Sequence, residues 1–357
     1  MVVINKQNIM KKTQEVITFK PKDITKRLLA VLSERAQDVV TKRYGLGKTS
    51  TCLTLEAIGS EYGITRERVR QIENFSINTI KKSDAYKAIS PAVSEVKDIM
   101  DTHGGIVHET EFLAAISADK GIQNHVHFIL VLADAFTKLK EDDEFYHSWT
   151  TNPKIADAIQ ISLRKISKNI SDNDLVTEPT LVNNLLKEVK DIADKSALDN
   201  EILARKWLKI SKLIDQNPLG EWGLSKSPNV KMRGIRDYAY LVLRQHGSPM
   251  HFEEVAKGIH RLFGKSAHPA TCHNELIKDT RFVLVGRGLY ALAEWGYSRG
   301  VVLDVIRTIL KKDGPLTRDE VITRVLKERH VKENTILVNL QNAKYFSKDS
   351  KGRYTLA

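Results

Sequence analysis

Residues 54–75 read TLEAIGSEYGITRERVRQIENF, and this stretch predicts two short helices joined by a tight turn. Gly63 stands where such a turn needs a positive φ angle, which glycine adopts without strain. Gly59 allows the second helix to pass close to the first, and Thr65 is suited to cap the start of the second helix. Five residues fall on the core-facing sides of the two helices: Ile58, Tyr62, Ile64, Val69 and Ile72. The stretch therefore predicts a helix-turn-helix.

Polar side chains of the second predicted helix share one face. At about 100° per residue, Val69 and Ile72 fall on one side of the helix and four polar residues fall on the other, namely Arg66, Glu67, Arg70 and Gln71. Arginine suits the O6 and N7 atoms of guanine, glutamine suits adenine, and glutamate accepts from N4 of cytosine. Arg68 lies at the flank, where a phosphate contact is more natural than a base contact. An ordinary charged helix face is the alternative that this pattern alone leaves open.

A wider stretch resembles region 4 of primary-type bacterial sigma factors, which binds promoters. It consists of LSERAQDVVTKRYGL (32–46) and then TLEAIGSEYGITRERVRQIE, and TRERVRQIE (65–73) matches the family's recognition helix almost letter for letter. The resemblance covers about residues 26–83. It implies a four-helix module that reads the −35 promoter element in the major groove and docks on the β-subunit flap of RNA polymerase.

The same resemblance implies which residues contact DNA. Carried over by position, base contacts fall to Arg66, Glu67, Arg70 and Gln71. Phosphate contacts fall to Arg35, Arg43, Thr54, Leu55 (through its backbone) and Arg68. Thr41 stands where the family usually has a basic phosphate contact, so this anchor is expected to be weaker. Residues 1–25, an expected N-terminal tail, are too short for the region with which primary sigma factors melt the −10 element. The chain is therefore not expected to open promoters by itself.

The glycine-rich stretch RYGLGKTS (43–50) has the look of a phosphate-binding loop, but its spacing is wrong. Such a loop needs a further glycine where this chain has Lys42, and it should follow a buried strand. Residues 32–40 are instead charged and spaced like a helix. We therefore interpret the stretch as the bend between the two halves of the DNA-binding module.

The chain after residue 90 repeats a pattern of three helices and a β-hairpin, which is typical of a winged helix. Residues 232–297 show it most clearly: two amphipathic helices separated by GSPM, a third that Pro269 can start, and a hairpin around Gly286-Arg287-Gly288. Residues 299–357 repeat it, with Thr317 and Glu320 as a capping box. We expect a winged-helix-like unit at 90–150 and a helical or winged-helix-like unit at 155–226, between the module at 26–85 and these two. Because the wings of the middle units are acidic or neutral, packing without a DNA role is favoured there.

The segment HNELIKDTRFVLVGRGLYALAEWGY (273–297) resembles the HARE-HTH winged helix, which the RNA polymerase delta subunit, some restriction-system proteins and chromatin proteins share. The resemblance implies a nucleic-acid or polymerase-associated role without fixed contact residues. Geometry gives the candidates Thr271, His273, Asn274 and Lys278 on the third helix and Arg287 at the wing tip. A solvated turn arginine is the alternative for Arg287. The expected core residues are Leu276, Ile277, Phe282, Leu284, Tyr290 and Leu292.

The composition favours a polyanionic partner. The chain carries 56 Lys plus Arg against 44 Asp plus Glu, a formal net charge of +12. A solvated basic surface is the plain alternative. Cys52 and Cys272 form neither a metal-ligand spacing nor a disulfide framework, which fits a reducing compartment. The N-terminus lacks the apolar core of a signal peptide, and no apolar run has the length of a membrane span. We expect a cytoplasmic, nucleoid-associated protein without membrane contact.

Catalytic patterns are weak throughout the sequence. Glu95 with Lys97, and Glu188 with Lys190, could be fragments of a nuclease site, but both pairs lie in helix-like surroundings without an acidic partner on a preceding strand. His125-Val126-His127 has nothing nearby to complete a metal-ligand set. We expect no enzyme activity, metal or cofactor.

These patterns predict a mainly α protein of tandem helix-turn-helix and winged-helix domains with small β-hairpin wings. The expected function is that of a non-enzymatic bacterial transcription factor, which binds double-stranded promoter DNA through residues 54–73 and associates with the RNA polymerase core. Two alternatives remain. One is a stand-alone DNA-binding repressor, and the other is a defence protein whose winged helices sense modified DNA.

Overall fold

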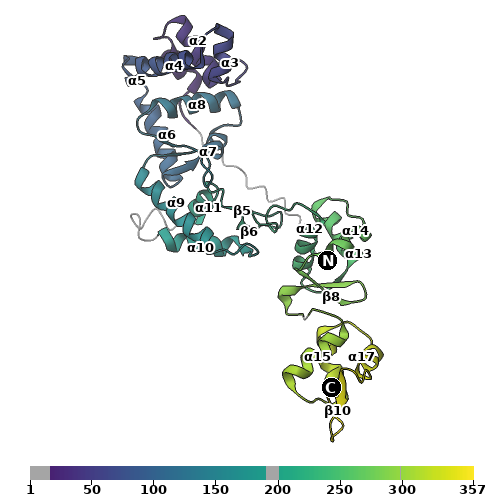
Figure 1. Cartoon of the computed structure of the whole chain (residues 1–357). Helices are drawn as coiled ribbons and strands as arrows, with labels where there is room; N and C mark the ends of the chain where they lie inside the picture. The colour runs from purple at the N-terminus through teal and green to yellow at the C-terminus, as the bar shows by residue number, and fades with distance from the viewer. Residues whose placement is uncertain (1–16, 190–200, 298) are drawn as a thin grey trace. The chain divides into compact units, whose positions relative to one another are not determined.

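The computed structural model describes residues 17–189, 201–297 and 299–357, which are mainly helical with small antiparallel sheets (Figure 1). The predicted fold class is thereby confirmed. Contacts divide the chain into two compact bodies: an N-terminal body of Met1–Ser171 and Val176–Asp215, and a C-terminal body of Asp172–Leu175 and Gln216–Ala357.

The helix-turn-helix module has four helices, as the resemblance implies: α1 Pro21–Leu29, α2 Glu34–Tyr44, α3 Leu55–Tyr62 and α4 Arg66–Lys81. The short helix α5 Asp84–Lys87 follows it. Residues 21–25, which the sequence places in the tail, belong to α1 because Pro21 starts the helix and Ile24 and Thr25 are buried. Residues 17–20 of the expected tail are also ordered against the body, since Phe19 packs on two apolar clusters and Thr18 donates to Glu95, and residues 1–16 lie outside the described part of the chain. Two apolar clusters hold the module, one of them around Val39, Ile58 and Val69.

The glycine-rich stretch is a bend that follows a helix. Helix α2 ends at Gly45, whose φ of +62° is left-handed, and α3 begins ten residues later at Leu55. The element before the bend is thus a helix where a phosphate-binding loop would need a strand, so its interpretation as a link within the module is confirmed. The Asn124 side chain of a later helix fastens the bend, because its Nδ2 donates to the backbone oxygens of Gly45 at 3.0 Å and Ser50 at 2.9 Å.

Two successive segments of the chain share one order of elements, helix, strand, two helices and two strands. The first winged helix has α6 Ser90–Thr102, β1 Ile106–His108, α7 Glu109–Ile116, α8 Lys120–Leu132, β2 Thr137–Leu139 and β3 Ser148–Thr150. The second has α9 Pro153–Lys168, β4 Val176–Thr177, α10 Glu178–Val189, α11 Glu201–Leu208, β5 Ile214–Gln216 and β6 Glu221–Leu224. The strand orders are β1-β3-β2 and β4-β6-β5.

The order recurs twice more within the C-terminal body. The third winged helix has α12 Ile235–His246, β7 Met250–His251, α13 Phe252–Phe263, α14 Pro269–Lys278, β8 Phe282–Gly286, β9 Leu289–Leu292 and the 3-10 turn η1 Ala293–Trp295. Its strand order is β7-β9-β8. The fourth has α15 Val302–Asp313, α16 Arg318–Glu328, α17 Glu333–Leu340, β10 Phe346–Lys348 and β11 Tyr354–Leu356. A single bridge between Leu316 and Tyr354 replaces its first strand.

The third helices of the first two winged helices are buried by neighbours. Helix α8 contributes Phe128, Ile129 and Leu132 to a core shared with α1, α2 and α4 of the helix-turn-helix module. In α11, Trp207 is fully buried against the first winged helix, where a Cβ on Gly104 would lie 2.6 Å from the indole ring. By contrast, α14 and α17 each bury only two residues, Cys272 and Leu276 in one and Ile336 and Leu340 in the other.

Local predictions for the last two winged helices are mostly confirmed, with two corrections. Pro269 starts α14, and Thr317 and Glu320 form the capping box of α16. The prediction that Ile277 and Leu284 lie in the core was wrong, since they are 61% and 49% exposed. Ile277 is turned about 100° from buried Leu276 around α14. Leu284 lies on the opposite face of β8 from its neighbours Val283 and Val285, which pack under Trp295 and Tyr297.

Candidate nucleic-acid interface

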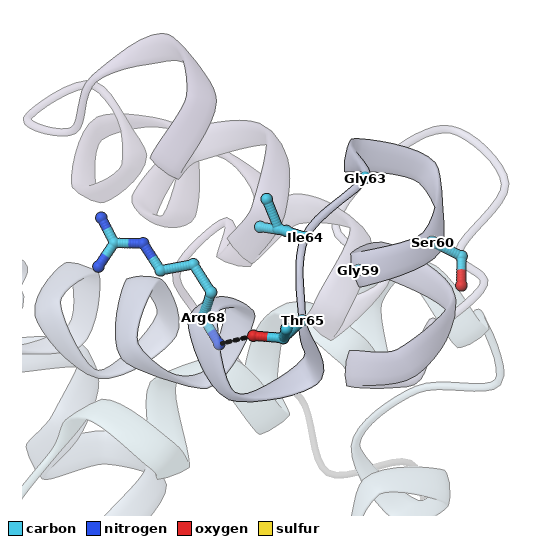
Figure 2. Close-up of a pocket in the computed structure, with 6 residues that line it drawn as sticks. All are labelled: Gly59, Ser60, Gly63, Ile64, Thr65 and Arg68. Atoms are coloured by element: carbon cyan, nitrogen blue, oxygen red, sulfur yellow. Dashed lines mark hydrogen bonds between the residues drawn. The ribbon is translucent and has the colours of Figure 1, made fainter.

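The turn between α3 and α4 has the geometry that the sequence predicts (Figure 2). Gly63 has a φ of +64°, and the Ile64 N–H donates to the Gly59 oxygen at 2.9 Å. A Cβ on Gly59 would lie only 2.7 Å from the Ile64 oxygen, so the close approach requires glycine. The Thr65 hydroxyl accepts from the Arg68 N–H at 3.2 Å and caps α4. The three predictions for Gly59, Gly63 and Thr65 are therefore confirmed.

In its first seven residues, Arg66–Ile72, helix α4 presents its polar residues outward and its apolar residues to α2 and α3. Val69 is completely buried with Val39 and Ile58, and Ile72 packs against the same cluster. The four predicted base-reading residues are all exposed: Arg66, Glu67, Arg70 and Gln71. The helix thus offers a continuous polar surface at its N-terminal half, anchored from behind by Val69.

Neighbouring side chains on this surface pair along the helix. Arg70 donates from Nε and Nη2 to both carboxylate oxygens of Glu67, at 2.8 and 2.6 Å. The hydrogen bonds from Arg70 lower the pKa of Glu67. Arg68 donates in the same way to Oε1 of Gln71 at 3.1 Å. These exposed pairs order the side chains weakly, and base edges can take over their hydrogen bonds.

A surface hollow at the start of α3 gathers three predicted phosphate contacts and one base-reading residue. It is lined by Arg43, Thr54, Leu55, Glu56 and Arg66. Thr54 caps α3, since its hydroxyl accepts from the Ala57 N–H at 3.1 Å. The first N–H groups of a helix lack intrahelical acceptors and carry the positive end of the helix dipole. The hollow therefore combines a guanidinium pair with a helix N-terminus, a combination that suits a phosphate.

Glu73 is a positioning residue that the sequence reasoning missed. Its Oε1 accepts from Nε of Arg43 at 3.4 Å and from the Tyr44 hydroxyl at 2.8 Å, while Nη1 of Arg43 donates to the Leu53 oxygen at 3.2 Å. Burial and the Glu73 carboxylate raise the pKa of Tyr44. On a helical wheel Glu73 falls near 340° from Arg66, on the flank toward the core, which is the signal that could have identified it.

The other predicted phosphate contacts lie outside this hollow. Arg35 stacks over the Tyr62 ring at 5.3 Å and shares a second hollow with Thr41 and Asp38. Arg68 lines a third hollow at the helix-turn-helix turn, and its side chain points away from that turn (Figure 2). The structure therefore brings Arg43, Thr54 and Leu55 together with Arg66, and it places Arg35 and Arg68 apart from them.

The candidate contact residues on the third winged helix differ in how far their side chains are exposed. Thr271, Asn274 and Lys278 are exposed on α14, and Arg287 is exposed at the tip of the β8–β9 hairpin. His273 is half-buried: its Nδ1 lies 3.0 Å from the Tyr290 hydroxyl, and its ring stacks 4.6 Å from that of Phe252. Four of the five candidates can therefore reach a ligand directly, whereas His273 is engaged within the domain.

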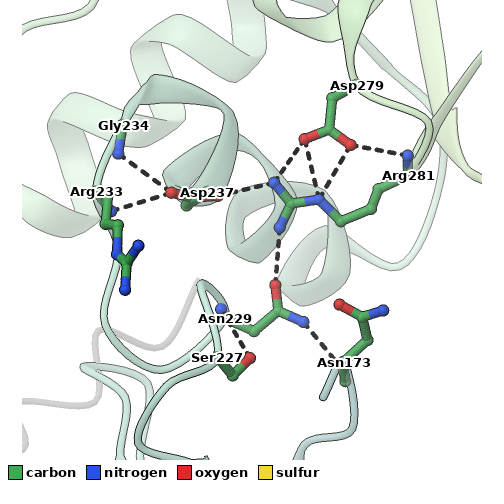
Figure 3. Close-up of polar contacts among 8 residues, drawn as sticks. All are labelled: Asn173, Ser227, Asn229, Arg233, Gly234, Asp237, Asp279 and Arg281. Carbon is green, nitrogen blue, oxygen red and sulfur yellow. Dashed lines mark hydrogen bonds and ion pairs between the residues drawn. The ribbon is translucent and has the colours of Figure 1, made fainter.

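A polar network fixes the third winged helix to the segment that precedes it (Figure 3). Arg281 donates to Asp237 at 2.8 Å, to Asp279 at 2.6 Å and to the side-chain oxygen of Asn229 at 2.9 Å. Asp237 accepts in turn from the backbone N–H groups of Arg233 and Gly234, and Asn229 donates to the Asn173 oxygen. The largely buried guanidinium therefore joins the start of α12, the start of β8 and the two incoming stretches of chain.

The weak catalytic patterns have structural partners. His125 shares a buried 2.6 Å hydrogen bond with the Thr25 hydroxyl, and burial lowers the pKa of this histidine. His127 instead faces Glu109 at 3.5 Å. Glu95 accepts from Thr18, and Lys97 pairs with Asp101.

The described residues contain no group of three or more His, Cys, Asp or Glu side chains placed to hold a metal ion. None of their helices is long and apolar enough to cross a membrane. Of the second suspected nuclease pair, Lys190 lies outside the described residues.

Two segments of the chain match known families. Residues 28–82 match the family described as Sigma-70, region 4, and residues 234–295 match HARE-HTH, a helix-turn-helix domain whose description names restriction endonucleases. Both matches confirm the resemblances that the sequence carries. The first match covers the end of α1 and all of α2, α3 and α4, and the second covers the third winged helix from the start of α12 to η1.

Similar proteins include several RNA polymerase sigma factors. The RNA polymerase sigma factor RpoD of Helicobacter pylori is 35% identical over 78 residues, which are 22% of this chain and 12% of that protein. The sigma factor RpoS of Coxiella burnetii is 51% identical over 51 residues, 14% of each chain, and the principal sigma factor HrdD of Streptomyces viridifaciens is 35% identical over 69 residues, 19% and 20% of the two chains. The chain thus matches a fifth or less of each relative's length.

Proposed function

We propose, on the premise that residues 28–82 are a sigma-70 region 4 module, that this protein is a non-enzymatic bacterial transcription factor that recognises −35-like promoter DNA. One observation carries the proposal: Arg66, Glu67, Arg70 and Gln71 are exposed together on α4 while Val69 behind them is fully buried. A helix anchored in this way can enter the major groove with base-reading groups facing the base edges.

The proposed binding mode follows from the two ends of the helix-turn-helix. The hollow formed by Arg43, Thr54 and Leu55 takes a backbone phosphate and sets the register of the protein on the duplex. The N-terminal half of α4 then lies in the groove, where guanine can replace Glu67 as the acceptor for Arg70. Glu67, released from Arg70, is free to accept from cytosine.

Association with RNA polymerase, through the β-subunit flap, is the second part of the proposal. It rests on the names of the similar proteins, which are RNA polymerase sigma factors, and on the match of residues 28–82. The expected location is the cytoplasm, on the nucleoid. The net charge of +12 supports a polyanionic partner, whether or not the protein also binds RNA polymerase.

Binding-site selection with the purified full-length chain tests the DNA part. Arg70→Ala should weaken binding to the selected sequence by about 5- to 150-fold, equivalent to about 1–3 kcal/mol, and should relax specificity at one base position. Arg27→Ala, which removes an exposed arginine from α1, is the matched control and should leave the preference intact. An unchanged sequence preference in the Arg70→Ala protein would refute the assignment of α4.

Co-purification with RNA polymerase core tests the partner. Recovery of polymerase with the tagged chain supports a polymerase-associated factor. Sequence-specific DNA binding without polymerase in the pull-down would instead indicate a stand-alone repressor. Selection that succeeds only with chemically modified DNA would indicate a defence role. This alternative is tested because the description of the family matched by residues 234–295 names restriction endonucleases.

A further inference from the structure

The fourth winged helix is strongly basic, in contrast to the first. Residues 299–357 carry 13 Lys plus Arg against 7 Asp plus Glu, whereas residues 90–150 carry 4 against 11. The same architecture is thus built with opposite surface charge. A net positive charge on so small a domain favours binding of a polyanion, and a net negative charge opposes it.

The third helix of this domain keeps a free outer face. Helix α17 buries Ile336 and Leu340, and on its other side Val338 is 67% exposed. Asn334 precedes Val338 by one turn and Gln341 follows it by one, and both are exposed. Two amides that suit adenine therefore flank an isopropyl group that suits the thymine methyl. In the first winged helix the corresponding helix α8 is packed against neighbouring helices and has no such exposed face.

The hairpin beside this helix has a preorganised tip. The Asp349 carboxylate accepts from the N–H groups of Lys351 and Arg353, both at 2.9 Å, and from Nε of Arg353 at 2.9 Å. Gly352 completes the turn with a φ of +74°. The turn leaves the Lys351 side chain exposed at its end. A lysine on a fixed turn loses little backbone entropy when it binds a phosphate.

Two further lysines lie between the helix and the tip. Lys344 lies over the Tyr345 ring at 5.6 Å, and Lys348 lies over the Tyr354 ring at 4.9 Å. Arg307 also approaches the Tyr345 ring, at 5.4 Å. Rings under the ammonium groups hold them near the surface while leaving them charged. Helix, lysines and tip follow one another along residues 334–351.

We infer that residues 334–351 form a second double-stranded DNA contact, separate from the helix-turn-helix. Asn334, Val338 and Gln341 face base edges in the major groove, and Lys344, Lys348 and Lys351 contact phosphates. A duplex of DNA fits this surface better than RNA, because the major groove of A-form RNA is too deep and narrow for helix side chains. The inference does not depend on −35 recognition by α4, since the two surfaces share no residue.

Salt-dependent binding of the full-length chain to duplex DNA tests the phosphate contacts. A variant with Lys344→Ala, Lys348→Ala and Lys351→Ala is compared with a control that loses the same charge from the ends of α15 and α16, through Lys311→Ala, Lys312→Ala and Lys327→Ala. The first variant should lower the slope of log K against log salt by about 2.7, so that a rise from 50 to 200 mM salt weakens it about 40-fold less than the parent. The control should retain nearly the parent slope. Equal slopes for the two triple variants would overturn the inference.

Two further measurements separate the inference from the proposed function and from an RNA ligand. In an Arg70→Ala background the triple variant should still lower the slope, even if α4 has no sequence preference. Val338→Asp should weaken duplex binding while leaving thermal unfolding unchanged, because the side chain is exposed. Competition by an equal concentration of structured RNA, but not by duplex DNA, would overturn the assignment of the ligand.

Discussion

Alanine at two glycines of the helix-turn-helix should have different consequences for DNA recognition. At Gly63 nothing lies within 4 Å of a new Cβ, so Gly63→Ala meets only the cost of a φ of +64°. That strain is about 1–2 kcal/mol, offset by about 0.4–1 kcal/mol from the stiffer unfolded chain. At Gly59 the new Cβ would lie 2.7 Å from the backbone oxygen of Ile64, which cannot move aside as a side chain can. Crowding there costs about 3 kcal/mol, offset by about 1 kcal/mol of helix propensity.

The expected net losses are therefore about 0–1.6 kcal/mol for Gly63→Ala and about 2 kcal/mol for Gly59→Ala. Hydrogen exchange at the buried residues Ile58 and Val69 measures both, because it reports local opening of α3 and α4 without requiring the whole chain to unfold in one step. Gly59→Ala should also displace the start of α4 and weaken the preference for the selected DNA sequence, whereas Gly63→Ala should retain that preference. A larger loss of protection or specificity for Gly63→Ala would refute the idea that the contact at Gly59 positions α4.

Two other predictions concern pH and the C-terminal body. Burial lowers the pKa of His108 and His125 below the ordinary 6.5, so the unfolded chain takes up protons first as the pH falls. The free energy of unfolding should therefore decrease as the pH drops below about 6.5. Urea unfolding near pH 7.5 and pH 5.5 measures this decrease, which should be smaller for His125→Gln than for the wild type. Arg281→Ala leaves Asp237, whose side chain is 4% exposed, without its guanidinium and should destabilise the third winged helix by about 3–5 kcal/mol. Thermal unfolding checks this, and a midpoint equal to that of the wild type would show that the network contributes little.

Local patterns predicted most of the helix-turn-helix because its geometry depends on neighbours in sequence. Spacing within about twenty residues predicts the turn glycine, the cap at Thr65 and the exposed polar residues of α4. The anchoring of Arg43 did not follow, because Glu73 lies 30 residues away and reaches it only once α2 and α4 pack together. Helical periodicity places Glu73 on the flank toward the core, but it does not show that Arg43 is the partner of this carboxylate.

The exposure of Ile277 and Leu284 was mispredicted for a related reason. An apolar residue type alone does not show whether a side chain in the third helix or the wing is buried. The direction in which the side chain points decides that. The wing strand β8 buries Val283 and Val285 on one face under Trp295 and Tyr297. Leu284 shares the other face with Phe282, and the domain core covers Phe282 but leaves Leu284 49% exposed. Sequence alone gave no indication that both faces of this short hairpin would compete for apolar partners.

The burial of α8 could be read from the sequence, and it distinguishes the first winged helix from the last two. From Val126 to Leu132 the helix reads VHFILVL, apolar on nearly all sides, and a helix of that kind must be buried. Its burial against α1 and α2 merges the first winged helix with the helix-turn-helix module into one core. Asn124 and His125 complete this core with hydrogen bonds to the Gly45–Ser50 bend and to Thr25. In the last two winged helices, α14 and α17 each bury only two residues, so their outer faces stay exposed, and the proposed contacts are assigned to these faces and not to α8.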